Sequence, residues 1–252
     1  MERQVISFAG IILTLWGMKI KKIIRLLAAF SVAMGYLEGA VVVYLRELFY
    51  PEGFDFPLQP ITSLVAVTEI IREAATLIML VTIAWIAGRT GTERFGFFLF
   101  CFAVWDITYY VALYLLLGWP ESLLTWDILF LIPVTWVGPV IGPVLNSLSM
   151  ILLALLISHK TSLKPTTRII RKEWLLLIAG SLIVIVAYTE DYVGFMLTRF
   201  SFAEIFFPSD AVALMEYASG YIPLSFSWWI FWIGQGAILA GIVLFFRRKE
   251  AK

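Results

Sequence analysis

Residues 61–88 read ITSLVAVTEIIREAATLIMLVTIAWIAG, a run that is apolar enough to cross a lipid bilayer except for Glu69, Arg72 and Glu73 near its middle. A side chain held ionised at the bilayer centre costs about 3 kcal/mol even on lenient insertion scales, so such charges usually face a bundle interior or a wet cavity. The spacing i, i+3, i+4 puts all three on one face of a helix. This stretch therefore predicts a transmembrane helix with a buried polar site.

The composition of the whole chain also indicates a membrane protein. Of its 252 residues, 61% are hydrophobic and only 15% are charged, and the mean hydropathy is +0.92. Soluble domains carry about 25% charged residues and lack repeated apolar runs of about 20 residues. The net charge of +1 and the lack of a basic block give no sign of a nucleic-acid partner. The lipid bilayer is the expected surrounding.

Apolar windows of spanning length occur six times, so we predict an all-α polytopic membrane protein with six transmembrane helices. A single transmembrane domain then covers residues 23–246, between an N-terminal segment, 1–22, and a basic tail, 247–252. Residues 4–17 are too short to cross comfortably, and the segment 1–22 is expected to be interfacial or frayed. Met18 is an alternative first residue of the protein. The predicted crossings are 23–49, 61–87, 95–117, 140–157, 174–192 and 222–246.

The positions of Lys and Arg predict the orientation, because cytoplasmic loops carry an excess of these residues. If six helices alternate, the basic flank before the first crossing, two basic connections and the tail all fall on one side. The opposite side keeps only Arg46 and Arg199 and collects most of the acidic loop residues. We therefore predict that both termini are cytoplasmic, in the cytoplasmic (inner) membrane of a prokaryote.

The segment 119–157 contains Pro133, Pro139 and Pro143 and is too long for one ordinary crossing. Proline removes a backbone donor and clashes with the preceding turn, which argues against an unbroken helix. We predict a short outer helix from about residue 120 to 131 that turns near Pro133 before the fourth crossing. The alternative is one long, proline-kinked helix. On the predicted outer helix, Asp127 would cover the polar site.

Other crossings supply polar partners for the charged triplet. Glu38 lies beside Gly35 and Gly39, a small-residue pair that allows close helix approach. Asp106 has two tyrosines at i+3 and i+4, and Arg46 lies near the predicted outer rim. The candidate substrate- or ion-binding residues are therefore Glu38, Arg46, Glu69, Arg72, Glu73, Asp106, Tyr109, Tyr110, Asp127 and Asn146.

The count of charges is informative. Glu38, Glu69, Glu73 and Asp106 would repel one another around a single Arg72, so protons or a bound cation must neutralise part of the excess. If a divalent metal is bound, these four carboxylates are its expected ligands. A purely structural ion-pair network is the alternative.

With one His and one Cys, the chain lacks the side chains for bis-histidine haem, histidine-ligated zinc or Ser-His and Cys-His catalysis, and no other cofactor is predicted.

Three functions fit this pattern. The first is a small proton- or cation-coupled carrier, in which the carboxylates titrate near mid-membrane. The second is a membrane-embedded enzyme that acts on a lipid or lipid-linked substrate through carboxylate acid-base or divalent-metal chemistry. The third is a non-catalytic subunit or assembly factor, with other membrane subunits or further copies of this chain as partners. The carrier is preferred because the carboxylates outnumber the guanidinium.

Overall fold

Six helices in the described part of the chain are long and apolar enough to span a membrane, as the sequence predicts. The structure is a computed structural model that describes residues 8–248, and the side chains of residues 20–248. The spanning stretch of the first helix begins at Ile20. The six helices are α1 (Phe8–Phe49), α2 (Ser63–Ala87), α3 (Gly91–Leu117), α4 (Ile141–Leu163), α5 (Arg171–Leu197) and α8 (Trp228–Arg247).

The boundaries differ from the predicted ones by a few residues at most ends. The larger differences include α4, which ends at Leu163 and not at residue 157, and α8, which begins at Trp228 and not at residue 222. Helix α1 runs without interruption from Phe8, so residues 8–22 continue the first spanning helix, and their place relative to a membrane stays a prediction. The predictions for residues 1–7 and for residues 249–252 of the basic tail lie outside the described residues.

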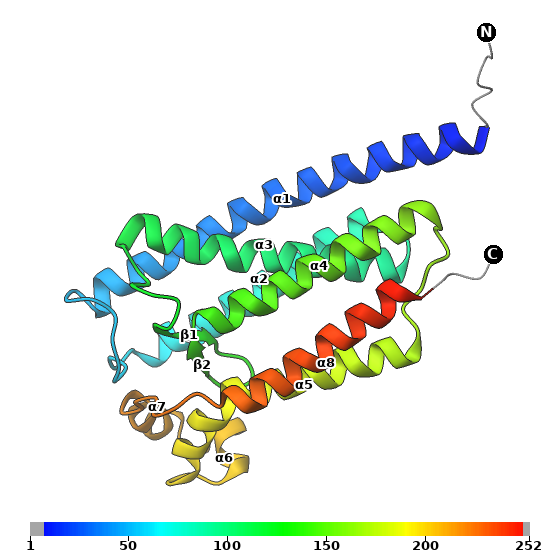
Figure 1. Cartoon of the computed structure of the whole chain (residues 1–252). Helices are drawn as coiled ribbons and strands as arrows, with labels where there is room; N and C mark the ends of the chain where they lie inside the picture. Colours follow the sequence, from blue (N-terminus) through cyan, green and yellow to red (C-terminus); the bar gives the residue numbers. More distant parts are fainter. Residues whose placement is uncertain (1–7, 249–252) are drawn as a thin grey trace.

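The helices form a bundle in which both ends of the chain lie at the same end (Figure 1). The closest pairs are α1 with α3, α3 with α4, and α5 with α8. Glycines allow these approaches: a Cβ on Gly35 of α1 would lie 2.6 Å from the Trp105 carbonyl oxygen of α3, and one on Gly180 of α5 would lie 2.7 Å from the Gly234 carbonyl oxygen of α8. Small residues at contacts are typical of helices that associate in lipid.

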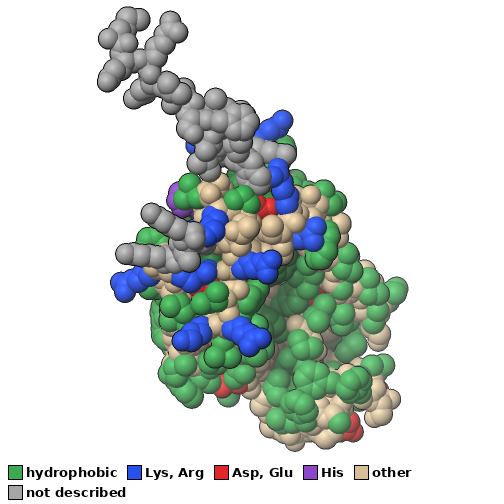
Figure 2. Space-filling view, turned by 90° about the vertical axis from the view of Figure 1, so that its right-hand side faces the viewer, with side chains coloured by type: hydrophobic (Ala, Val, Ile, Leu, Met, Phe, Trp, Pro, Cys, Tyr) green, Lys and Arg blue, Asp and Glu red, His purple; other side chains and the backbone are tan. Residues whose placement is uncertain are grey.

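Lysine and arginine side chains gather on the end of the bundle that carries the two termini, where Figure 2 shows them facing the viewer. The half of the bundle near this end is closed by an apolar core. That core includes Leu80 of α2, Phe100 of α3, Ile157 of α4 and Phe245 of α8. The far half is more open and contains the polar residues described below.

The segment between α3 and α4 corrects the sequence prediction, because it contains a β-hairpin and no helix. Strand β1 (Trp126–Phe130) pairs antiparallel with β2 (Trp136–Pro139), with Trp126 opposite Pro139. Both the predicted outer helix over 120–131 and the alternative of one kinked helix are therefore wrong. Aromatic and β-branched residues favour strands, and Pro133 suits the turn between them. The fold is mostly helical, with one small sheet.

Two short helices complete the far end of the molecule. Helices α6 (Phe202–Phe206) and α7 (Ala211–Ser219) lie beyond the hairpin, away from the termini (Figure 1). Helix α7 has no buried residue, and Phe202, Phe207 and Val212 are exposed apolar side chains on these helices and their connection. Exposed apolar surface of this kind is typical of helices that lie in the membrane interface.

Candidate functional site

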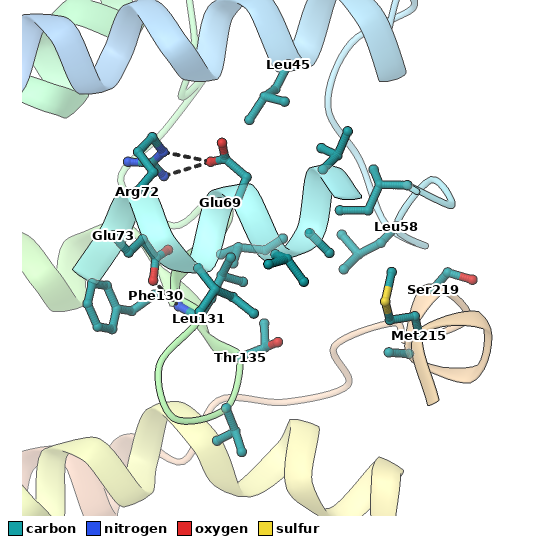
Figure 3. A pocket seen from close by; sticks show the side chains of 18 of the residues that line it. Leu45, Leu58, Glu69, Arg72, Glu73, Phe130, Leu131, Thr135, Met215 and Ser219 are labelled. Carbon is teal, nitrogen blue, oxygen red and sulfur yellow. Dashed lines mark hydrogen bonds and ion pairs between the residues drawn. The ribbon is translucent and has the colours of Figure 1, made fainter. Parts of the chain in front are cut away.

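A cavity of about 930 Å³ lies in the far half of the bundle. Its walls are the far ends of α1 and α2, the middle of α3, the β-hairpin and helix α7 (Figure 3). Most of the side chains that line it are apolar or aromatic. Charged groups from five different elements, α1, α2, α3, β1 and α7, also reach it. They are Glu38, Arg46, Glu69, Arg72, Glu73, Asp106, Asp127 and, exposed at the edge, Glu216.

Arg72 joins two carboxylates from two helices. Its Nε donates to Glu69 Oε2 on the same helix at 2.8 Å, and its Nη1 forms an ion pair with Glu38 Oε1 of α1. Thr76, one turn further along α2, donates from Oγ1 to Glu38 Oε2 at 3.5 Å. The Arg72 side chain is 22% exposed, so the group is only partly shielded. This cluster connects α2 to α1.

Glu73 points away from this cluster toward the hairpin (Figure 3). Its Oε2 accepts a hydrogen bond from the backbone N–H of Leu131 at 2.9 Å. Adjacent helical residues are about 100° apart, so Glu73 cannot share the direction of Arg72. The charged triplet of α2 therefore divides, and no ion pair among the described residues involves Glu73.

Arg46 and Asp127 form a second charged pair. Arg46 Nη2 lies 3.5 Å from Asp127 Oδ1, and its guanidinium carbon lies 3.7 Å from the ring centre of Trp119 and 4.5 Å from that of Phe54. Both charged side chains are buried, with Arg46 at 7% exposure and Asp127 at 2%. Aromatic faces and a carboxylate are the surroundings that stabilise a planar cation. Arg46 is thus held in place on three sides.

Asp127 lies on strand β1 and not on the predicted outer helix. Burial raises its pKa to about 6, against the lowering effect of Arg46. Its second oxygen, Oδ2, is buried and meets no donor with full hydrogen-bond geometry among the described residues, and the nearby hydroxyls of Tyr109 and Tyr110 offset only part of the cost of burial. Buried polar atoms are nearly always satisfied, so an orphaned oxygen in a cavity wall marks a place where water or a ligand binds.

Asp106 of α3 supplies a further carboxylate to the same cavity. Ser147 of α4 donates to its Oδ2 at 2.7 Å, and no described basic side chain pairs with it. One turn later on the same face, Tyr109 and Tyr110 also line the cavity, with ring centres 4.9 Å apart. The third helix therefore contributes an acid and two phenol groups, as its sequence spacing predicts.

Asn146 is the predicted site residue that the fold separates from the others. Its Nδ2 donates to the hydroxyl of Tyr188 at 2.8 Å, in the contact between α4 and α5, and it does not line the cavity. The residues that sequence reasoning missed are Thr76, Phe54, Trp119 and the Leu131 backbone. Thr76 had a signal, since it follows Arg72 by four positions, whereas the other three depend on loop geometry.

The carboxylates of the cavity do not converge on one point. Within the part of the chain that the structure describes, no three His, Cys, Asp or Glu side chains come together as a set that could hold a metal ion. The set suggested by the charge count, namely Glu38, Glu69, Glu73 and Asp106, is instead distributed along the walls. Glu38 and Glu69 share Arg72, whereas Glu73 accepts from the Leu131 N–H and Asp106 accepts from Ser147.

No known family model, curated protein or solved structure matches this chain. The functional assignment therefore depends on the geometry of the cavity alone.

Proposed function

We propose that this integral membrane protein is a small carrier that couples the movement of its substrate to protons. The observation that carries the proposal is the charge of one cavity, where five carboxylates that are not solvent-exposed accompany two guanidinium groups. Arg72 pairs with Glu38 and Glu69, and Arg46 pairs with Asp127, which leaves Glu73 and Asp106 without a basic partner among the described residues. Carboxylates shielded from water with too few basic partners favour the uptake of protons or the binding of a cation.

Protons are the favoured coupling ion. A metal cation would need several oxygen ligands at one point, and the described carboxylates are spread along the walls. A proton needs only one carboxylate, and these acids have their hydrogen-bonding neighbours at separate places along the walls. Protonation would therefore act on individual contacts in the cavity wall.

The packing of α2 supports a coupling mechanism. In its far half the buried side chains are all polar, namely Glu69, Glu73 and Thr76, whereas its near half buries Leu80 and Ala84 in the apolar core. The far half is thus held to α1 and to the hairpin mainly by polar contacts. Protonation of Glu38 or Glu73 would weaken the bond to Arg72 or to the Leu131 N–H. The far half of α2 would then be free to move while its near half stays packed.

The pivot for such a motion would lie near the turn between α2 and α3. Gly88 follows α2, and a Cβ at this position would lie 2.7 Å from Arg94 of α3, so the two helices are closely joined here. By the positive-inside rule, the basic end in Figure 2 would face the cytoplasm. The cavity would then open toward the extracytoplasmic side in this conformation.

The alternative is a membrane-embedded enzyme that acts on a lipid or lipid-linked substrate. The apolar walls of the cavity and the exposed apolar side chains of α6 and α7 favour it, since a lipid chain could enter there. Many such substrates carry a phosphate, and the cavity offers it no unpaired cation among the described residues, because Arg46 and Arg72 are both neutralised. This is why the carrier is preferred.

A subunit role is the third possibility, and the exposed apolar face of α2 favours it. Ile71, Ile78 and Trp85 on this face are all exposed and would contact either lipid or a partner helix. An isolated subunit has no need for a cavity with excess acids. The subunit reading predicts that a second protein co-purifies in fixed proportion.

Alternating access distinguishes a carrier from both alternatives and needs no knowledge of the substrate. The test places one cysteine in the cavity wall, Ala66→Cys, in a Cys101→Ser background, and reconstitutes the full chain in liposomes of uniform orientation. A membrane-impermeant maleimide is applied from either side at pH 5 and pH 8. We expect labelling from both sides, with a ratio that changes with pH.

Two exposed positions provide the controls. Ser209→Cys in the far loop and Thr166→Cys between α4 and α5 lie at opposite ends of the bundle, and each should react from one side only. If Ala66→Cys reacts only from the side that labels Ser209→Cys at every pH, the cavity does not alternate. That result would exclude the carrier in favour of the enzyme or the subunit.

A further inference from the structure

We propose that the cavity binds an amphipathic organic cation. This cation would be the substrate of the carrier proposed above, so its transport rests on that proposed function. The first reason is the state of the basic residues. Of the described residues that line the cavity, only Arg46 and Arg72 are basic, and both already contact carboxylates. An anionic amphiphile would therefore meet an excess of negative charge and no free positive charge.

The second reason is that the acidic groups have unused capacity. Glu73 and Asp106 form no ion pair with a described residue. Asp127 does pair with Arg46, but its Oδ2 is buried in the wall of the cavity and meets no donor with full hydrogen-bond geometry among the described residues, with only the Tyr109 and Tyr110 hydroxyls nearby. This oxygen is a second line of evidence for a ligand, separate from the number of acids, because a buried oxygen without a well-placed donor is costly.

The third reason is the size and character of the walls. Cavities for drug-sized ligands measure about 300–1,000 Å³ and are mostly apolar, and at about 930 Å³ this one lies in that range. A bare inorganic ion would leave most of it empty. Aromatic rings of Trp105, Tyr109, Phe130 and Tyr192 lie in the walls with the carboxylates. Such rings attract a cation through their faces while they accept its apolar parts.

Arg46 shows how the cavity accommodates a cation. Its planar guanidinium lies over Trp119, near Phe54 and beside Asp127, so one cation of this protein is already held by aromatic faces and a carboxylate. The remaining walls repeat the combination, with Asp106 one turn from Tyr109 on α3, and Glu73 beside the hairpin that carries Phe130. A second, exogenous cation would find the same kind of surroundings.

Two probes of equal shape and opposite charge test this inference. Tetraphenylphosphonium and tetraphenylborate have the same four phenyl groups around one central atom. Binding of each to the full chain in lipid nanodiscs is measured by equilibrium dialysis, with protein-free nanodiscs as the blank for partition into lipid. We expect saturable binding of tetraphenylphosphonium that is at least about tenfold tighter than that of tetraphenylborate, which corresponds to about 1.4 kcal/mol. This comparison uses the wild-type chain and does not depend on any variant folding.

Variants then assign the binding to this cavity. Glu73→Gln and Asp106→Asn should each weaken tetraphenylphosphonium binding by about tenfold, because each removes one unpaired charge. Glu121→Gln, an exposed acid outside the cavity, is the matched control and should bind as the wild type does. Thermal unfolding of each variant identifies any that fail to fold, and Phe130→Ala, which removes an aromatic wall but no charge, provides an independent variant.

Each outcome decides one of the two proposals. Tetraphenylborate binding equal to or tighter than tetraphenylphosphonium binding would overturn the cation inference, and so would equal binding by wild type and all cavity variants. Cation binding without two-sided labelling of Ala66→Cys would retain the ligand class and reject the carrier. Two-sided labelling without cation binding would retain the carrier and reject the ligand class.

Discussion

Glu38 of α1 and Arg72 of α2 are 34 residues apart in sequence and form an ion pair in the wall of the cavity. The pair joins two helices that otherwise have little direct contact, because α1 packs mainly on α3. Glu69 shares the same guanidinium. The contact therefore contributes both to the stability of the bundle and to the chemistry of the proposed site. The two roles can be separated by experiment.

Removal of Arg72 should be far more harmful than removal of an exposed arginine. Arg72→Ala leaves Glu38 and Glu69 without their cation, and breaking a buried pair from one side typically costs about 3–5 kcal/mol, which is an upper limit here because the Arg72 side chain is 22% exposed. Arg199→Ala in the exposed far loop should cost less than about 1 kcal/mol. Thermal unfolding in detergent measures both. Equal losses in the two variants would show that Arg72 has no special structural role.

Glu73 allows its charge to be separated from its hydrogen bond. Glu73→Gln keeps a carbonyl oxygen that can accept the Leu131 N–H, so we expect little loss of stability. Glu73→Leu leaves that N–H without its partner and should cost about 1–3 kcal/mol. Both variants remove one titrating group and should reduce the pH dependence of Ala66→Cys labelling, with Glu38 left to titrate. If Glu73→Gln keeps a wild-type pH response, Glu73 is not a coupling residue.

Asp127 should make the protein less stable as the pH rises from about 4 to 6. Burial raises its pKa from 3.8 to about 6, so the folded state holds the proton more tightly than the unfolded state does. The stabilisation is complete below about pH 4 and is lost as the pH rises through 6, with a total of at most about 3 kcal/mol. Unfolding of wild type and Asp127→Asn between pH 4 and 8 measures it. Parallel curves for the two proteins would refute the assignment.

The glycine contact between α1 and α3 should not tolerate a methyl group. In Gly35→Ala the new Cβ would lie 2.6 Å from the Trp105 carbonyl oxygen, so the helices must separate, at a cost of about 1–3 kcal/mol. Glu38 would move with α1 and loosen its pair with Arg72. Gly236→Ala on α8 has open space around its Cβ and should be neutral or slightly stabilising, because alanine favours helix. Equal melting temperatures for the two variants would contradict the close packing.

The hairpin shows why one part of the fold could not be predicted. Residues 126–139 contain both helix-compatible leucines and strand-favouring tryptophans, and their periodicity does not choose between the two states. The choice depends on contacts with distant parts of the chain, such as the hydrogen bond that the Leu131 N–H donates to Glu73 and the ion pair of Asp127 with Arg46. These partners are 58 and 81 residues away, which is beyond any local pattern.

The sequence by itself determined the six spanning helices, because apolar length is a local property that the bilayer thickness converts directly into structure. It also determined which polar residues must find partners, since an ionised group in hydrocarbon is too costly to leave exposed. Only the tertiary structure decided which partner each one has. Glu38 pairs with Arg72, Glu73 accepts from a backbone N–H, and Asn146 donates to Tyr188. These partners depend on the direction of each side chain around its helix and on the neighbour that it meets, and both are set by packing between distant segments.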